Sequence, residues 1–428
     1  MSPIVTHRLI VRLVLLAALF VGSYGGITAT AVAQEPVTIR FWTTAEDNYA
    51  DRIAQFQQEN PAIRVEAEFI GSYDDMAAKM QTSIAGNDTP DVAQVGQRYG
   101  IPQMVDAGVV MPVSDFYSPE EIADFREGLR NRFTYNGELV AIPFESSTPG
   151  LWMNETMMRE AGLDPANPPQ TWDEIVAAAK AMTKDTNGDG TIDQWGFSTC
   201  GDAPWYMRAM VLQNGGTLYG ADGAPAVNSP ESVEMLQWFQ DAVTTNQITP
   251  PLSQQGSEDA FVAGDYGLLF CSTARRVSYP EEIGDNFEVG VTYLPQQAQR
   301  AVGVGGNALI ALNSGDAVRE EAARTLVRWL TSADQTVVTA TTSGYVATRE
   351  SVMADPRMVD LLGNDAFAQT IYDQLQYVRD SSISPADSVL WDGLLAGLET
   401  VQTDDSATAQ GVLDQLQLDI EDYLDTYD

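Results

Sequence analysis

Histidine is almost absent from this chain. The only one among the 428 residues is His7, which lies close to the amino terminus. Ser-His-Asp and Cys-His catalysis need an imidazole to move a proton, and histidine is a common ligand of zinc. The body of the chain has no histidine, so these chemistries, and with them many classes of hydrolase, are excluded.

Basic residues are also scarce. The chain has 23 Lys and Arg against 60 Asp and Glu, which gives a formal net charge of −37. A protein that binds nucleic acid needs a basic surface to neutralise phosphates. Nucleic acid is therefore not expected as a partner, and anionic membrane surfaces are disfavoured. The acidic excess favours a role in solubility over a role as a docking patch.

Cysteine is limited to Cys200 and Cys271. In an oxidising compartment the two thiols could pair as a disulfide. Two separate buried thiols fit the sequence equally well, so both readings stay open at this stage.

The chain also lacks an apolar run of membrane-spanning length. Residues 13–21 are apolar, but this stretch is too short for an ordinary transmembrane helix. It follows Arg8 and Arg12 and precedes a small-residue cleavage pattern at 31–33. The arrangement predicts a secretory signal, residues 1–33, that is cleaved before Gln34, with an uncleaved anchor as the alternative. No cysteine follows the apolar run at that point, so we expect a protein free in the periplasm rather than lipid-anchored.

Strands and helices alternate after the signal. The patterns predict strands at 37–42, 63–69 and 91–95, with helices at 49–60 and 73–85 between them. Such alternation favours a mainly parallel α/β sheet. Ligands of these sheets bind beyond the carboxyl ends of the strands. At 428 residues the chain is long for one core, since single cores stop growing beyond about 250–300 residues, so two domains are expected.

The segment 143–154 holds the most informative pattern. It reads as a strand leaving one domain, the hydroxyl-rich triplet Ser146, Ser147 and Thr148, and a strand entering a second domain. Hydroxyls donate and accept hydrogen bonds, as a polyol or phosphate ligand requires. Clefts between domains are common binding sites for small ligands. Further along, the pattern predicts a return strand and then mainly helices, at 301–312 for the strand and at 318–331, 333–341, 367–377 and 407–427 for the helices.

The crossing, the run that continues from it to Ile175 and the order of motifs along the chain resemble family 1 of the extracellular solute-binding proteins of ABC importers. Within that family the resemblance is greatest to the sn-glycerol-3-phosphate-binding proteins. It implies an α/β, two-domain periplasmic-binding-protein fold of type II, in which each domain has a central sheet flanked by helices and the ligand cleft lies between domains. The N-terminal lobe is predicted at 35–145 plus 303–350 and the C-terminal lobe at 146–302 plus 351–428.

The resemblance also implies a function. We expect a monomeric, non-enzymatic substrate-binding component of an ABC importer, which captures a small-molecule solute in the periplasm and delivers it to the transmembrane subunits of the permease. The ligand is expected to be a sugar, a polyol or a glycerophosphate derivative. Alternatives are sn-glycerol 3-phosphate itself, an oligosaccharide and, less favoured, a secreted glycoside-active enzyme. No cofactor is expected apart from the calcium ion considered below.

The resemblance carries ligand contacts onto particular positions. Those that match the family pattern are Tyr73, Ser147, Ser272, Gly306 after Gly305, Tyr345 after Gly344 and, more loosely, Trp205. Trp42 joins them as an aromatic residue predicted at the edge of the cleft. Aromatic rings supply apolar area with a polar tip, which suits a sugar.

Two positions depart from the family pattern. Gln97 stands where the family has an acidic residue, and Trp391 stands where it has an arginine that pairs with phosphate. An arginine fork is the natural partner of a phosphate, whereas a tryptophan offers an apolar face. We therefore expect a neutral glycoside or polyol, or a glycerophosphodiester. Arg98, Arg275 and Arg276 are the candidates to replace the missing arginine.

A calcium-type loop begins at residue 185. Oxygen-bearing side chains recur with the spacing of an EF-hand loop, at Asp185, Asn187, Asp189, Thr191 and Asp193. Its sixth position is a glycine, as in the EF-hand, but its twelfth is Gly196 instead of glutamate. The loop predicts a structural calcium ion, with a polar turn between a helix and a strand as the alternative.

Overall fold

The computed structural model describes residues 35–47, 49–96, 100–220, 222–379 and 383–427. The predicted signal, 1–33, and two residues of interest, Gln97 and Arg98, lie outside these ranges. Residues 37–428 form one unit, and the description concerns that unit alone. Within the described part of the chain, no helix combines the length and apolar character that a membrane crossing needs.

Five strands make the first sheet, in the order β2-β1-β3-β11-β6. Their bounds are β1 Val37–Thr43, β2 Ile63–Phe69, β3 Val92–Gly96, β6 Ile142–Ser147 and β11 Gly305–Ala311. Four strands make the second sheet, in the order β10-β7-β9-β8. Their bounds are β7 Pro149–Asn154, β8 Trp195–Thr199, β9 Tyr266–Ser272 and β10 Val289–Tyr293. A small third sheet pairs β4 Thr134–Tyr135 with β5 Glu138–Leu139.

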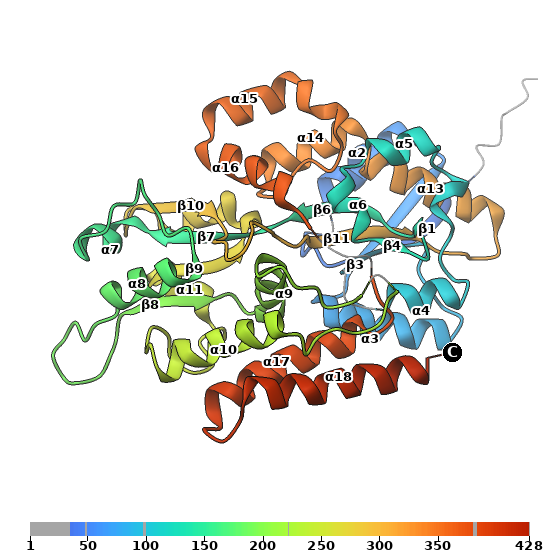
Figure 1. The fold of residues 1–428 in the computed structure, drawn as a ribbon. Helices are drawn as coiled ribbons and strands as arrows, with labels where there is room; N and C mark the ends of the chain where they lie inside the picture. Colours follow the sequence, from blue (N-terminus) through green and yellow to red (C-terminus); the bar gives the residue numbers. More distant parts are fainter. Residues whose placement is uncertain (1–34, 48, 97–99, 221, 380–382, 428) are drawn as a thin grey trace, which may run out of the picture. The chain divides into compact units, whose positions relative to one another are not determined.

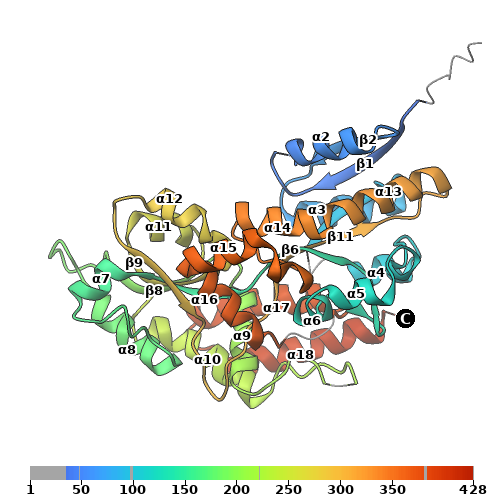
Figure 2. The same ribbon diagram turned by 90° about the horizontal axis from the view of Figure 1, so that it is seen from above.

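The helices surround these sheets (Figure 1). Those in the first half of the chain are α2 Ala50–Glu59, α3 Tyr73–Ala85, α4 Ile101–Asp106, α5 Pro119–Asp124, α6 Glu127–Asn131, α7 Glu155–Glu160, α8 Trp172–Met182 and α9 Ala203–Gln213. Those in the second half are α10 Pro230–Thr244, α11 Ser257–Ala263, α12 Ser278–Ile283, α13 Ala317–Leu330, α14 Ala333–Thr342, α15 Pro356–Asn364, α16 Ala366–Gln374, α17 Asp387–Thr403 and α18 Ala409–Asp425. Both views place α14, α15 and α16 side by side (Figures 1 and 2).

The expectation of a mainly parallel sheet is wrong, because both larger sheets are mixed. β1 pairs in parallel with β2 and β3, but β11 is antiparallel to β3 and β6. In the second sheet β7 is antiparallel to β9 and β10, and only β8 and β9 are parallel. The helical crossovers α2 and α3 impose parallel pairing on the first three strands alone. Strand β11 returns from the second sheet without such a crossover.

Side chains on the first sheet alternate between two cores. Phe41 packs with Phe56 of α2 and Leu326 of α13 on one face. Its neighbour Trp42 points to the other face and packs with Met76 of α3. Successive residues of a strand point to opposite faces, so a helix covers each face of this sheet. The second sheet is buried in a separate and larger core, to which α8, α9, α10 and α17 contribute.

Two connections between strands join the two larger sheets, one of a single residue and one of eleven residues. Only Thr148 separates the end of β6 in the first sheet from the start of β7 in the second. Between the end of β10 and the start of β11, the chain returns from the second sheet to the first. The predicted crossing is therefore present at 143–154. The exact bounds of the two predicted lobes stay a prediction.

The carboxyl-terminal helices connect distant parts of the chain. α17 packs on α9, α10 and α18. Near the end of α18, Gln103 of α4 donates through Nε2 to the Tyr423 hydroxyl at 2.9 Å. The Tyr427 hydroxyl donates to Asp106 Oδ2 at 2.6 Å. The last helix is thus held to α4, which precedes the first crossing (Figure 1).

The two cysteines form a disulfide, Cys200–Cys271. β8 and β9 run in parallel with Thr199 opposite Phe270, which places the next residue of each strand side by side. The Cys200 N–H donates to the Phe270 carbonyl at 2.8 Å, and the two Cα atoms are 5.2 Å apart. The structure thus decides between the two readings that the sequence left open.

Candidate functional site

A cavity of about 680 Å³ lies where the two larger sheets are joined. Strands β3, β6, β9 and β11 each end or begin at its wall, and α3, α9 and α17 contribute side chains. Seven of the nine residues predicted to bind ligand line this cavity: Tyr73, Ser147, Trp205, Ser272, Gly306, Tyr345 and Trp391. Their contact with a ligand stays a prediction, but the fold brings them to one place.

The other two predicted residues are placed differently. Trp42 is only 4% exposed and packs in the core between the first sheet and α3. The Lys79 ammonium lies 4.3 Å from the centre of its ring. Trp42 is not part of the cavity lining, because β1 directs it to the face that α3 covers. Gln97 lies outside the described residues.

Tyr73 is fixed from three sides. Ser72 caps α3 by accepting from Asp75 N–H, so the helix begins at Tyr73. A Cβ atom added to Gly96 would lie 2.9 Å from the Tyr73 ring, so only glycine lets the ring pack here. Asn307 Nδ2 donates to the Tyr73 hydroxyl at 3.0 Å. Burial raises the pKa of Tyr73 to about 12, so near neutral pH the ring keeps a neutral O–H.

Two serine hydroxyls from different sheets meet at the cavity wall. Ser272 Oγ donates to Ser147 Oγ at 3.1 Å and accepts from the Ala274 N–H at the same distance. Trp152 Nε1 donates to the Ser272 carbonyl at 3.1 Å, which anchors the end of β9. The Ser147 and Ser272 pair can both donate to and accept from a ligand hydroxyl.

Glycines allow Trp205 and the crossing strand to approach closely. Gly306 has φ of 89°, a left-handed conformation that favours glycine. A Cβ atom added to it would lie 1.9 Å from the Glu145 carbonyl oxygen. At Gly305 an added Cβ would lie 2.2 Å from Cζ2 of Trp205. The indole therefore lies directly on the backbone of β11, and its position is fixed by that contact.

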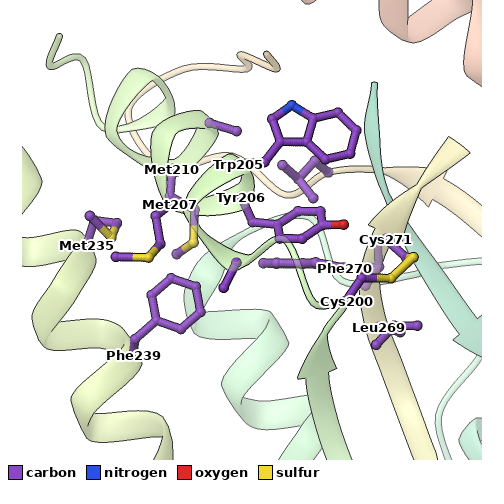
Figure 3. Packing of buried hydrophobic residues seen from close by; sticks show 14 of the residues in the cluster. Cys200, Trp205, Tyr206, Met207, Met210, Met235, Phe239, Leu269, Phe270 and Cys271 are labelled. Atoms are coloured by element: carbon purple, nitrogen blue, oxygen red, sulfur yellow. A yellow bond between two sulfur atoms is a disulfide. The ribbon is translucent and has the colours of Figure 1, made fainter. Parts of the chain in front are cut away.

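Trp205 also presents a polar atom. The residue is 5% exposed, and among the described residues its buried Nε1 has no hydrogen-bond acceptor. Buried donors in proteins are nearly always paired. An indole N–H on a cavity wall can be satisfied by a ligand oxygen. Figure 3 shows Trp205 and Tyr206 on α9, near the Cys200–Cys271 disulfide.

Arg98, Arg275 and Arg276 are the candidates to replace the arginine that the family pattern has at the position of Trp391. Arg275 lines the cavity, and its Nη2 lies 2.5 Å from Glu258 Oε2. Arg276 points elsewhere, because its Nη1 lies 2.6 Å from Asp365 and its Nη2 donates to the Ala340 carbonyl. Arg98 lies outside the described residues. Of the described candidates, only Arg275 reaches the cavity.

Trp391 is 2% exposed and forms part of the wall where the family pattern has an arginine. Its ring lies 5.5 Å from the guanidinium of Arg208, a contact of the cation–π type. Arg208 is itself buried and is not part of the lining.

Several residues that line the cavity were not among the binding residues predicted from the sequence. Asp202, Glu258 and Glu281 bring carboxylates to the cavity, and Cys200 and Cys271 bring the disulfide. Asp202 had a usable signal, because it closely follows β8 and the carboxyl ends of strands are where ligands bind. Glu258 and Glu281 come from short helices and carry no local sign of their position.

The calcium-type loop makes its hydrogen bonds internally. Asp185 accepts from Gly188 N–H at 2.6 Å and Gly190 N–H at 2.7 Å, and Asp193 accepts from Thr186 N–H at 2.8 Å. Among the described residues, only Cys200, Glu258 and Cys271 form a group of three His, Cys, Asp or Glu with ligand atoms within 4.8 Å of one another. The carboxylates of the loop do not converge in this way, and the cysteines of that group are joined as a disulfide.

Two mixed sheets, short crossings between them and a cavity of hydroxyls and aromatic rings at those crossings define a solute-binding protein with the type II periplasmic fold. The family model described as bacterial extracellular solute-binding protein matches residues 51–361. The chain belongs to this family.

Individual relatives agree with this placement. The sn-glycerol-3-phosphate-binding periplasmic protein UgpB of Yersinia pestis bv. Antiqua (strain Antiqua) is 26% identical over 309 residues, which cover 68% of this chain and 69% of the relative. The crystal structure of UgpB from Mycobacterium tuberculosis in complex with glycerophosphocholine superposes with a TM-score of 0.79 at 20% identity, over 92% of this chain and 99% of that one. An ABC substrate-binding protein of Listeria monocytogenes in complex with cycloalternan gives a TM-score of 0.78 at 20% identity, over 91% and 100%. The likeness to these structures concerns the fold.

Proposed function

We propose that this protein binds a sugar- or polyol-type solute, a neutral glycoside or a glycerophosphodiester, for an ABC importer. The observation that carries the proposal is the composition of the cavity wall. The paired hydroxyls of Ser147 and Ser272 and the N–H of Trp205 serve the oxygens of such a ligand. The ring faces of Trp205, Tyr345 and Trp391 serve its apolar surface.

The names of the relatives support the same range of ligands. They include binding proteins for sn-glycerol 3-phosphate and structures with glycerophosphocholine, cycloalternan and maltotriose. All of these compounds carry at least two hydroxyl groups. At 26% identity or less, the choice among them depends on this chain's own residues.

A phosphate-bearing ligand is the second candidate, and Arg275 is the residue that favours it. Its side chain lines the cavity, and its guanidinium forms an ion pair with Glu258. Because the guanidinium has five donors, it can keep this ion pair and still bind a phosphate oxygen. For such a ligand, we expect Arg275 to take the role that the family pattern gives to an arginine at the position of Trp391.

We further propose that no bond is made or broken at the site. The protein acts in the periplasm after export by the predicted signal at 1–33. The ligand's preference for a closed arrangement around the crossings shifts the equilibrium toward that form, which the permease subunits then recognise. A secreted glycoside-active enzyme is the alternative, and release of product from a glycoside panel would establish it.

Thermal unfolding against a ligand panel tests the proposed function. The mature protein is stripped of bound solute by unfolding and refolding, and its midpoint is measured with glucosylglycerol, trehalose, maltose, sucrose, glycerophosphocholine and sn-glycerol 3-phosphate. A ligand at about 100 times its Kd adds about 2.7 kcal/mol to the free energy of unfolding, so the midpoint rises. A shift with a neutral glycoside or with glycerophosphocholine is expected. A shift with none of the compounds contradicts the proposal.

Calcium binding by the loop at 185–193 stays a prediction. In the structure, the loop oxygens stabilise its own turns, which agrees with the polar-turn alternative. A comparison of the unfolding midpoint in calcium chloride and in EDTA tests it. A rise with calcium that Asp185→Asn abolishes supports a bound ion. An equal midpoint in both solutions leaves the loop as a turn.

A further inference from the structure

One buried arginine joins three segments that are far apart in the sequence. Arg276 belongs to the helical turn η2, Thr273–Arg276, which follows β9. It is 7% exposed and is not part of the cavity lining. Its guanidinium reaches the end of α14 and the beginning of α16, two helices that lie side by side in both views (Figures 1 and 2). The proposed function so far gives this residue no role.

The electrostatics of the two helix ends favour this arrangement. Nη2 of Arg276 donates to the carbonyl oxygen of Ala340 at 2.8 Å and to that of Ser343, which lie in the last turn and at the C-cap of α14. Nη1 lies 2.6 Å from Oδ2 of Asp365. Asp365 is the N-cap of α16, where it accepts from the Ala368 N–H at 2.9 Å. The helix dipole stabilises a cation at the carboxyl end of one helix and an anion at the amino end of another.

The carbonyl of Ser343 belongs to a segment that carries a predicted ligand contact. Gly344 and Tyr345 follow it directly, and all three residues line the cavity. A Cβ atom added to Gly344 would lie 1.8 Å from the Ala274 carbonyl oxygen, so the two backbones are in direct contact. The Tyr345 N–H donates to Ser343 Oγ at 3.2 Å. The segment therefore lies on η2 at the point where Arg276 holds it.

Strand β6 holds the segment on its other side. The Val346 N–H donates to the Ser146 carbonyl at 2.8 Å, one residue before Ser147 on the cavity wall. Tyr345 thus lies between two fixed points, with Arg276 at one and β6 at the other. A binding residue has to be held within about 0.5 Å of its productive position by the packing and hydrogen bonds of the residues behind it. Arg276 supplies such support for Tyr345.

We propose that Arg276 is a positioning residue for ligand binding. It does not touch the ligand but acts through Tyr345, because it holds the segment Ser343–Tyr345 on η2, between the ends of α14 and α16. This inference rests on the proposed function, since it requires a ligand in the cavity, and it adds the residue that keeps one predicted contact in place. Loss of Arg276 is expected to weaken binding without removing a group that the ligand touches.

Calorimetry on the mature protein, below its unfolding transition, tests the role of Arg276. The probe is whichever of glucosylglycerol, trehalose, maltose, sucrose, glycerophosphocholine and sn-glycerol 3-phosphate gives the largest thermal shift. Arg276→Met removes the guanidinium and keeps an apolar stem, while the carboxylate of Asp365, 31% exposed, remains hydrated. The variant is expected to bind about tenfold less tightly, which corresponds to about 1.4 kcal/mol. An unchanged Kd overturns the proposal.

Arg349→Met is the matched control. Arg349 is also 7% exposed and is not part of the cavity lining. Its Nε donates to the carbonyl of Thr331, the C-cap of α13, at 2.7 Å, and its Nη1 lies 3.0 Å from Asp124 Oδ2. Both variants are expected to lower the unfolding midpoint, but destabilisation alone leaves the Kd of a folded protein unchanged. A change in Kd of less than about twofold is therefore expected for Arg349→Met. An equal loss of affinity in both variants contradicts a positioning role.

A double-variant cycle shows whether Arg276 acts through Tyr345. Tyr345→Ala is expected to weaken binding by about tenfold, and Arg276→Met to add less than about twofold in that background, because the effects of coupled residues are not additive. A further tenfold loss in the double variant overturns the proposal. If Tyr345→Ala alone leaves Kd unchanged, the positioning role fails while the proposed function stands. A parent protein that binds none of the compounds contradicts the proposed function itself.

Two more variants serve if Arg276→Met does not fold. Arg276→Lys keeps the charge, but an ammonium lacks the planar fork that reaches two carbonyls and a carboxylate together, so a loss of about threefold is expected. Gly344→Ala moves the segment by another route, since its Cβ would collide with the backbone of Ala274, and a loss of at least about tenfold is expected. Unchanged affinity in either variant overturns the proposal.

Discussion

Replacing Trp205 with alanine is expected to reduce ligand affinity by about a hundredfold. The indole lies on the backbone of Gly305, lines the cavity and has a buried N–H with no acceptor among the described residues. Buried aromatic residues at the centre of a binding site commonly cost 2 kcal/mol or more when truncated, and a factor of a hundred is about 2.7 kcal/mol. Calorimetry with the compound that gives the largest thermal shift measures the effect.

Two further variants show which part of the Trp205 ring matters. Trp205→Phe keeps an aromatic face but loses the N–H, so a loss of about tenfold is expected if the ligand accepts a hydrogen bond from Nε1. Trp329→Phe is the control, because Trp329 lies on α13, away from the cavity, and its Nε1 donates to Glu59 at 2.7 Å. If Trp205→Ala binds as tightly as the Trp329→Phe control, Trp205 is not a ligand contact.

Local patterns predicted the elements around the site closely. The predicted segments 63–69 and 73–85 coincide with β2 and α3, and 143–154 covers Thr148, β7 and all of β6 except its first residue, Ile142. Alternation of period two and a capping serine are properties of neighbouring residues, so one sequence is enough to read them. Some positions carried over from the family pattern lie at the ends of these elements, since Tyr73 begins α3 and Ser147 ends β6.

Long-range pairing was not predictable in the same way. The antiparallel insertion of β11 depends on a strand that returns from the second sheet, and no local pattern gives its direction. Phe41 and Trp42 show that the face of the sheet to which a side chain points depends on its exact position in the strand. A shift of one position moves an aromatic side chain from one face to the other. Trp42 thus lies in the core beneath α3, although its type and neighbourhood suggested the cleft.

The hydrogen bonds of the Glu145 side chain illustrate the same limit. Gln94, Glu145 and Asn307 form one network, yet Gln94 and Glu145 are 51 positions apart and Glu145 and Asn307 are 162 apart. Glu145 and Asn307 lie in or beside segments that the sequence analysis singled out, but nothing in those segments indicates that their side chains meet Gln94. Arg275 and Arg276 are neighbours, and the short helical turn that contains them directs one to the cavity and the other to Asp365. The direction of each of these side chains is determined by packing with residues that are distant in the sequence.

Replacing Arg132 with alanine is expected to destabilise the protein by about 3–5 kcal/mol. Arg132 is fully buried, and its Nη2 lies 2.8 Å from Oδ2 of Asp387, whose side chain is 4% exposed. Removal of Arg132 leaves the buried Asp387 carboxylate without its counter-charge, with the Ser384 N–H still donating to Oδ2 at 3.1 Å. Asp387 begins α17, the helix that carries Trp391, so the damage reaches the wall of the cavity. Urea unfolding of the variant and the parent protein measures the difference.

The double variant Arg132→Met, Asp387→Leu distinguishes this mechanism from a simple loss of packing. If the cost comes from the stranded carboxylate, the double variant is more stable than Arg132→Ala, because apolar side chains of similar size can replace a buried ion pair at little cost. Arg357→Ala is the control, since Arg357 and its partner Asp334 are 46% and 62% exposed and such pairs contribute about 1 kcal/mol or less. A double variant as unstable as Arg132→Ala would show that packing, and not the stranded charge, sets the cost. Because Arg132 lies in the predicted N-terminal lobe and Asp387 in the C-terminal one, the pair also connects the two parts whose relative movement the proposed function requires.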